Sequence, residues 1–311
     1  MFERLQRKKK RDGLVAIDLH ADRVCVVHAE SAQARRPRIV KGAVYPLANG
    51  HVVTDALARA AREFDFKHLR CTTVLNDEDY KLLLTEAPDV PSTELKAALR
   101  WRVKDLIDFH VNDATLDVFD LPGEKTRGIA REMYVVAARS EAIRRRIDQL
   151  EHLGASLDVI DIPELAQRNV AALLPQDAEG VVLLALQPRA GLITVTRQGM
   201  LYLARPVPFG WDALADEDRR VEYFDQLVLE VQRSLDYFES HFRQAPLRHL
   251  VVAPMPVEAP DLVRHLASNL GTEVSAMDVN AIMDASALGA DVPAWCLTSI
   301  GAALRREAVP L

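Results

Sequence analysis

Two stretches of the chain, residues 14–30 and 182–199, follow the same plan: an apolar strand, a short polar turn and a second strand. Elsewhere, β-like apolar runs alternate with segments whose apolar residues recur at helical spacing. This alternation is typical of α/β proteins. The recurrence predicts two lobes that each open with a β-hairpin and that join near residues 173–180, where proline and glycine suit a linker. Ligands usually bind in clefts between such lobes.

Strands are predicted where short apolar runs are bounded by polar or turn residues. They are expected at 14–18, 23–29, 38–45, 71–75, 115–120, 133–138, 157–161, 181–186, 191–196, 200–206, 249–253 and 273–276. Gln198 and Gly199 separate two of these runs and predict a two-residue hairpin turn. Longer segments with one apolar face predict helices at 94–109, 140–153 and 221–243.

The chain has 311 residues, of which 49% are hydrophobic, enough for about two globular domains with their own cores. Its cysteines are far apart in sequence and form no CxxC pair: Cys25, Cys71 and Cys296. This usage indicates a reducing compartment, with each thiol in the core. The apolar runs are only strand-length, and the basic N-terminus leads into a strand of mixed polarity. We therefore expect a cytoplasmic protein with neither a membrane span nor a signal peptide.

Charge is distributed unevenly along the chain. The first twelve residues, "MFERLQRKKKRD", carry a net +4, and the whole chain carries −6, which leaves −10 for the remainder. Such an acidic body argues against a nucleic-acid partner. Residues 4–11 are basic enough to contact anionic lipid, at about 1 kcal/mol per basic residue near the surface. The alternative is a disordered, solubilising tail, because high charge by itself favours disorder.

Two short motifs have residues typical of a metal site or a phosphate-binding loop. Asp18, His20 and Asp22 alternate, so an extended segment would place them on one face, as metal ligands are placed. A polar turn after a strand accounts for the same residues, and we expect no metal site. "GEKT" at 123–126 lacks the GxxxxGK[ST] pattern of a P-loop. No GxSxG, HExxH or GxGxxG motif is present, so no catalytic residue is predicted.

The order of several segments carries a family resemblance. After the opening "LVAIDLHADRVCVVHAE" come "VPSTELKAALRWRVKDLIDF" at 90–109, "YVVAARSEAIRRRIDQLEHLGASLDVIDIPELAQRN" at 134–169, "ARPVPFG" at 204–210, "LVLEVQRSLDYFESHF" at 227–242 and "TSIGAAL" at 298–304. In this order they resemble the PilM-like branch of the actin/sugar-kinase/Hsp70 superfamily, and most closely its MshI family, which serves the biogenesis of MSHA-type pili. The resemblance covers almost the whole chain from residue 13.

The resemblance implies an α/β fold of the two-lobed, actin-like (ribonuclease H-like) type, with a small inserted α+β subdomain. Its domains would be a basic leader, a discontinuous first lobe, the insertion and the second lobe. Their residues would be 1–12 for the leader, 13–82 continuing at 156–178 for the first lobe, 83–155 for the insertion and 179–311 for the second lobe.

Active members of this superfamily hold ATP and Mg²⁺ with two hairpin phosphate loops, one in each lobe. In the first loop Asp18 matches the expected acid, but Leu19 and His20 stand where glycines are expected. Glycines matter there because a side-chain-free turn lets backbone N–H groups approach a phosphate closely. The resemblance therefore makes Asp18 the vestige of a phosphate loop.

The second loop departs further from the active pattern. Ala185 takes the place of the acid, Gln187 takes that of the glycine, and Pro188 has no N–H to donate. The stretch that would hold adenosine, 249–260, also lacks glycines. We therefore expect a degenerate ATPase fold that is not an enzyme and has no cofactor; binding of Mg-ATP remains the alternative.

With no catalytic activity expected, the function that the resemblance implies is that of a binding scaffold. It implies a cytoplasmic protein, peripheral at the inner membrane, that serves a type IV (MSHA-type) pilus assembly platform. Its partner would be a bitopic inner-membrane protein, PilN-like or MshJ-like, whose cytoplasmic peptide binds between the first subdomain and the inserted one. The alternative function is a nucleotide-dependent actin-like ATPase of PilM type. A sugar-kinase-like enzyme is a third and remote reading, because it too needs the phosphate loops.

The corresponding partner groove would have helix 94–109 and the strands at 115–120 and 133–138 as its walls. On that helix Trp101 is the expected anchor, because aromatic residues are enriched at binding hot spots. Arg100 and Lys104 would flank it with positive charge. The alternative for Trp101 is ordinary packing in a core.

Overall fold

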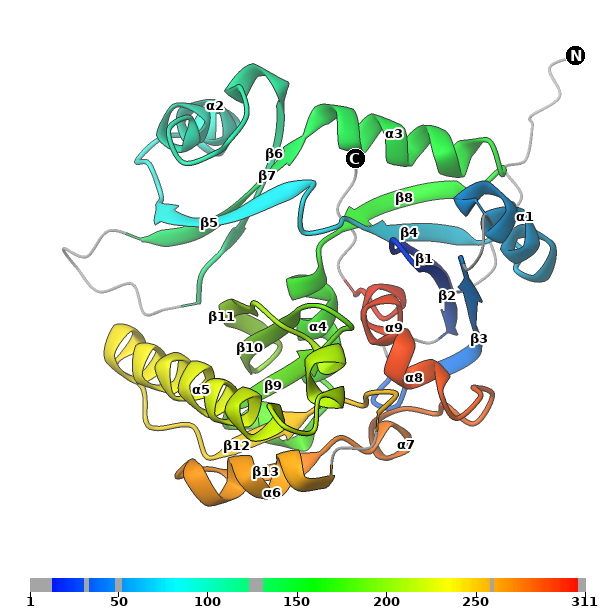
Figure 1. Cartoon of the computed structure of the whole chain (residues 1–311). Helices are drawn as coiled ribbons and strands as arrows, with labels where there is room; N and C mark the ends of the chain where they lie inside the picture. Colours follow the sequence, from blue (N-terminus) through cyan, green and yellow to red (C-terminus); the bar gives the residue numbers. More distant parts are fainter. Residues whose placement is uncertain (1–12, 31–33, 48–51, 123–130, 258–259, 307–311) are drawn as a thin grey trace, which may run out of the picture.

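The two lobes are built on two five-stranded mixed sheets (Figure 1). In the computed structural model, which describes residues 13–30, 34–47, 52–122, 131–257 and 260–306, the first sheet has the order β3-β2-β1-β4-β8. Its strands are β1 (Leu14–Leu19), β2 (Arg23–Glu30), β3 (Arg38–Pro46), β4 (Arg70–Val74) and β8 (Ser156–Asp161). The basic leader and the "GEKT" segment lie outside the described residues.

The second sheet repeats the plan of the first. Its order is β11-β10-β9-β12-β13, and in both sheets three antiparallel strands precede two strands that run parallel to the first. The strands are β9 (Val181–Leu186), β10 (Gly191–Arg197), β11 (Met200–Val207), β12 (His249–Val252) and β13 (Glu273–Ala276). The predicted duplication is therefore confirmed. Gln198 and Gly199 both have positive φ, 52° and 72°, as a tight two-residue hairpin requires.

A third, antiparallel sheet is inserted into the first lobe. Its order is β5-β7-β6, with β5 (Tyr80–Glu86), β6 (Ala114–Asp120) and β7 (Glu132–Arg139). Every strand predicted from the sequence is present, but β5 was not among them, because its apolar core "LLL" is short and lies between charged residues. This sheet starts at Tyr80, inside the segment that the expected boundaries gave to the first lobe.

Helix α2 (Ser92–Val103) covers one face of the inserted sheet and is shorter than predicted. The expectation of a helix over 94–109 is wrong beyond Val103. Asp105 and Asp108 are poor helix formers, and the chain must turn back to reach β6. Asp108 accepts a hydrogen bond from Arg139 at 3.0 Å on the neighbouring strand. As a result Leu106, expected on the buried face, is 57% exposed.

The remaining helices cover the two large sheets. The predicted α3 (Ser140–Glu151) and α5 (Arg220–Phe242) are observed. Beside them are α1 (Val53–Glu63), α4 (Pro163–Ala171), α6 (Pro260–Asn269), α7 (Val279–Ile282), α8 (Val292–Trp295) and α9 (Leu297–Ala303). Although α3 follows the insertion directly, its Leu150 belongs to the core of the first lobe. Among the described helices, none combines the length and apolar character that a bilayer crossing requires.

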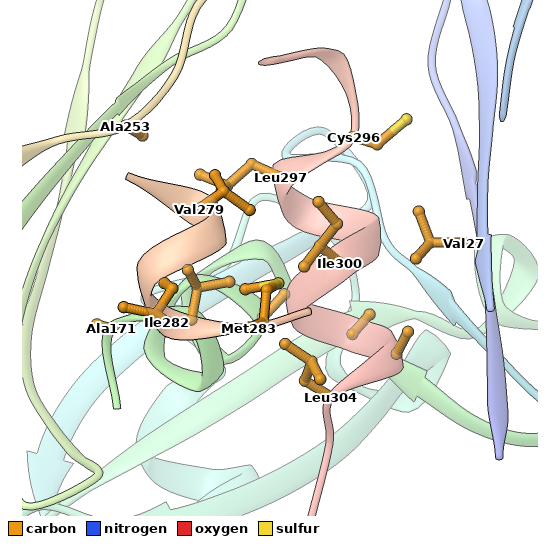
Figure 2. Packing of buried hydrophobic residues seen from close by; sticks show 14 of the residues in the cluster. Val27, Ala171, Ala253, Val279, Ile282, Met283, Cys296, Leu297, Ile300 and Leu304 are labelled. Atoms are coloured by element: carbon orange, nitrogen blue, oxygen red, sulfur yellow. The ribbon is translucent and has the colours of Figure 1, made fainter. Parts of the chain in front are cut away.

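A single buried cluster joins the lobes. It combines Val27 of the first sheet, Ala171 of α4, Ala253 after β12 and Ile300 of α9, and Figure 2 shows Ile300 and its neighbours packed between these elements. Helices α4 and α9 approach so closely that a Cβ on Gly301 would lie 1.9 Å from the carbonyl oxygen of Ala166. The relative position of the lobes is therefore held by a core, and the cleft opens beside it.

Candidate functional site

The candidate site lies where the first hairpin turn of each lobe faces the other. Arg23, at the start of β2, donates from Nη2 to Oε1 of Gln187, at the end of β9, over 2.6 Å. Its Nη1 donates to both carboxylate oxygens of Asp22, at 2.8 and 3.1 Å, and its guanidinium lies 5.0 Å from the ring centroid of Trp295. Arg23 is only 3% exposed. A buried cation of the chain itself thus bridges the two turns.

In the second turn, the backbone N–H of Gln187 is not free to bind a ligand in the cleft. The N–H of Gln187 donates to the carbonyl of Ala190 at 2.8 Å, and its own carbonyl accepts from Trp211 at 3.0 Å. The backbone of Gly210 packs so tightly on this turn that a Cβ there would lie 1.9 Å from the Gln187 oxygen. Pro188 adds no N–H. Neither Gln187 nor Pro188 can therefore donate a backbone N–H to a phosphate at this turn.

Asp18, the expected vestige of the first phosphate loop, lies at the end of β1 and is 2% exposed. Its Oδ2 lies 3.0 Å from Nε2 of His20. Burial alone would raise the pKa of Asp18, but the charge of His20 offsets it and the pKa is lowered. Burial likewise opposes protonation of His20, yet Asp18 raises its pKa to about 10. The Asp18 carboxylate is therefore neutralised by a protein cation.

The alternating residues Asp18, His20 and Asp22 do not converge on one point. The Asp22 carboxylate is engaged by Arg23, whereas Asp18 and His20 face each other. Among the residues that the structure describes, no group of His, Cys, Asp or Glu side chains is arranged to hold a metal ion.

A cavity of about 550 Å³ lies between the lobes beside these turns. Its walls come from β4, β5, β7, α4 and the hairpins of the second sheet, and most of the lining side chains are apolar. The charged residues in the wall are Asp18, His20, Asp77, Lys81 and Glu164. An interlobe cleft was predicted from the duplicated sequence plan, but most of these wall residues were not.

Glu164 is an acid of the cavity wall whose pKa lies above its ordinary value. It lies in the first turn of α4, and its Oε2 accepts a hydrogen bond from the Tyr80 hydroxyl at 2.7 Å. Burial raises the pKa of Glu164 to about 7, although the bond from Tyr80 acts in the opposite direction. Sequence reasoning missed this pair because an acid in the first turn of a helix is commonplace and because β5, which carries Tyr80, was not predicted.

Substitution of Glu164 by glutamine should change how stability depends on pH. The folded state holds the Glu164 proton up to a higher pH than the unfolded chain, whose value is near 4.5. The wild-type protein therefore loses stability from this group as pH rises from about 4.5 past 7. Glutamine still accepts from Tyr80 but does not titrate. We expect the variant to gain on the order of 1 kcal/mol over wild type at pH 8, and no such gain at pH 4.5, in denaturant unfolding.

Glutamine at the exposed Glu179 is the matched control and should show no pH-dependent difference. Parallel pH profiles for the Glu164 variant and wild type would contradict the assignment of a raised pKa to Glu164.

The predicted partner residues lie on α2, away from the cleft. Trp101 is 74% exposed, and the Lys104 ammonium lies 5.6 Å from its ring centroid. On the opposite face of the helix Leu99 and Val103 are fully buried against the inserted sheet. The structure thus brings Trp101 and Lys104 together at the surface and excludes the alternative that Trp101 packs in the core.

Arg100 is placed differently from the other two. Its Nη1 donates to the carbonyl of Val111 at 2.6 Å and so ties α2 to the segment that returns to β6. The space between α2 and the sheet is filled by Leu99, Leu116 and Val135 among other buried residues. The facing surfaces of helix and sheet therefore do not form the open groove that was expected between them.

Comparisons with known proteins connect this geometry to a fold. No family model matches the chain, and no curated protein matches it. A solved structure described as the PilM-PilN type IV pilus biogenesis complex superimposes with a TM-score of 0.72 at 20% identity, over 94% of this chain and 98% of that chain.

Two further solved structures are similar. The cytoplasmic domain of EpsL, an inner membrane component of the type II secretion system of Vibrio cholerae, gives a TM-score of 0.51 at 14% identity, over 83% of this chain and 94% of that one. A Bacteroides thetaiotaomicron protein with an actin-like ATPase fold and unknown function gives 0.52 at 9% identity, over 91% and 98% of the two chains. The chain therefore has the two-lobed actin-like fold that the sequence resemblance implied.

Proposed function

Taking the actin-like fold as the premise, we propose that this protein is a non-catalytic scaffold of a type IV pilus assembly platform. The observation that carries the proposal is the bridge from Arg23 to Gln187, because it joins the two turns between which an ATPase of this fold holds phosphates. The scaffold would bind the cytoplasmic segment of a PilN-like inner-membrane protein. The similarity to a structure described as a PilM-PilN complex supports such a partner.

Three features of the cleft oppose ATP hydrolysis. The side chain of Asp18, which would help to position Mg²⁺, is paired with His20, and Ala185 offers no second carboxylate. The Arg23 guanidinium, whose charge would otherwise attract a phosphate, is buried and already donates to Asp22 and Gln187. Polyphosphate binding relies on free backbone N–H groups and a metal ion. Within the described residues no group of side chains is arranged to hold a metal ion, and the N–H of Gln187 already donates to Ala190.

The finer assignments of the proposal come from the sequence resemblance. They are a place in an MSHA-type system as an MshI-like protein, an MshJ-like partner and a cytoplasmic position peripheral to the inner membrane. Contact of residues 4–11 with anionic lipid would reinforce that position. For the partner we propose Trp101 as the anchor, with Lys104 beside it, because the structure exposes both on the outer face of α2.

Millimolar Mg-ATP should leave the melting temperature of the purified protein unchanged. A nucleotide present at about 100 times its Kd would stabilise the folded state by about 2.7 kcal/mol, an easily measured shift. Differential scanning fluorimetry with and without Mg-ATP is therefore a direct test. An ATP-dependent shift that disappears in Asp18→Asn would refute the pseudo-ATPase assignment and favour the alternative, a nucleotide-dependent ATPase of PilM type.

A further inference from the structure

Aromatic rings are a distinctive part of the interlobe cavity wall. Tyr80, Tyr134 and Tyr237 all line the cavity of about 550 Å³. The hydroxyl of Tyr80 donates to Glu164, and that of Tyr134 donates to the Tyr202 carbonyl at 3.0 Å. Tyr80 and Tyr134 are only 5% and 6% exposed, so the ring of the half-buried Tyr237 is the most accessible of the three.

Neighbouring rings hold two of these tyrosines in place. Tyr134 stacks on Phe119 with ring centroids 5.0 Å apart, and Tyr237 stacks on His241 at 4.8 Å with the ring planes 13° apart. Side chains fixed in this way lose little further entropy when a ligand binds. The cavity wall therefore offers one preorganised and accessible aromatic ring, that of Tyr237.

The charges in the wall are predominantly negative. Among the described residues, neither Asp77 nor Glu164 has a cationic side chain within ion-pair distance. Of the two cations, His20 is paired with Asp18, and the Nζ of Lys81 lies 3.8 Å from Asp108.

Asp18 adds unused hydrogen-bonding capacity to this wall. Although its Oδ2 is in ion-pair contact with His20, this buried atom makes no hydrogen bond of normal geometry within the described part of the chain. A polyphosphate would meet the carboxylates of Asp77 and Glu164 as like charges, whereas a cation would meet them as opposite charges.

We infer that the interlobe cavity is a binding site for a small organic ammonium ion with an apolar body. Aromatic ring faces attract such cations, and quaternary ammonium groups are recognised in this way in proteins. The carboxylates of Asp77 and Glu164 supply the countercharge, and Leu82, Leu192 and Leu203 supply apolar wall for the rest of the molecule. The volume lies within the usual range of about 300–1,000 Å³ for small-molecule sites. This site is independent of the scaffold function and of its partner surface on α2.

The experiment compares three probes that share one aromatic body and differ in charge. Benzyltrimethylammonium, benzyl alcohol and benzoate are each titrated into the full chain by isothermal titration calorimetry at pH 8, where Glu164 is largely ionised. We expect saturable binding of the ammonium probe and at least about tenfold weaker binding of the other two. Equal binding of all three, or tighter binding of benzoate, would overturn the inference.

Two variants locate the site, and a third serves as the matched control. Asp77→Asn removes a cavity carboxylate, and Glu78→Gln removes the adjacent exposed carboxylate that does not line the cavity. We expect about tenfold weaker binding of benzyltrimethylammonium to Asp77→Asn and to Tyr237→Leu, and wild-type binding to Glu78→Gln. Because Asp77 is exposed at the cavity rim and Tyr237 is only half-buried, these variants should fold. Equal losses in Asp77→Asn and Glu78→Gln would show a general surface effect and reject the site.

Discussion

Gly301→Ala should cost this protein about 3 kcal/mol or more of folding free energy, and so lower its melting temperature by roughly 5 °C or more. A Cβ at this position would lie 1.9 Å from the oxygen and 2.5 Å from the carbonyl carbon of Ala166. Both are backbone atoms of α4, so the contact is relieved only if α4 and α9 move apart. That movement would also stretch the bond from Asn169 Nδ2 to the Gly301 carbonyl, 2.9 Å long.

Gly271→Ala provides the matched control. Nothing lies within 4 Å of the position that a Cβ would take there, so we expect a melting temperature close to that of wild type. Thermal unfolding followed by circular dichroism distinguishes the two variants. If the two variants had the same melting temperature, the close approach of α4 and α9 would not be a determinant of how the lobes are held together.

Trp101→Ala should abolish most partner binding while leaving stability nearly unchanged. Truncation of a true binding anchor costs at least about 2 kcal/mol, or about a 30-fold loss of affinity. Truncation of a fully buried tryptophan would instead lower stability by about 3–5 kcal/mol. Because Trp101 is 74% exposed, only the first cost is expected. Thermal melting and binding to membranes that contain the bitopic partner measure the two quantities separately.

Two further variants sharpen this experiment. Leu229, on α5, is 49% exposed and lies on the second lobe, so Leu229→Ala controls for the loss of an arbitrary exposed apolar side chain. Arg100→Ala should lower stability, because it removes the bond to the Val111 carbonyl. Undiminished recruitment of Trp101→Ala, or equal loss in Leu229→Ala, would place the partner site elsewhere than on α2.

The sequence by itself determined every strand except β5, and it determined the residue types that depart from the phosphate-loop pattern. Strand positions follow from short-range alternation and from turn residues such as Gln198 and Gly199, whose conformational demands are local. The expectation that nucleotide chemistry is lost rests on residue type alone, because Ala185 has no carboxylate and Pro188 no N–H in any conformation. The family resemblance supplied the arrangement of the elements, which periodicity does not contain.

Only the tertiary structure decided which side chains meet. Arg23 and Gln187 are 164 residues apart, and Tyr80 and Glu164 are 84 apart, so no local pattern predicts either hydrogen bond. The end of α2 at Val103 depends on where β6 starts and on Arg139 of the neighbouring strand. Likewise, an aromatic residue in an amphipathic helix suits either a core or a surface. Trp101 is exposed because the sheet beneath α2 packs against Leu99, on the other face of the helix. The periodicity of a sequence shows which face of an element is the more apolar, whereas the burial of each side chain depends on which elements pack against it.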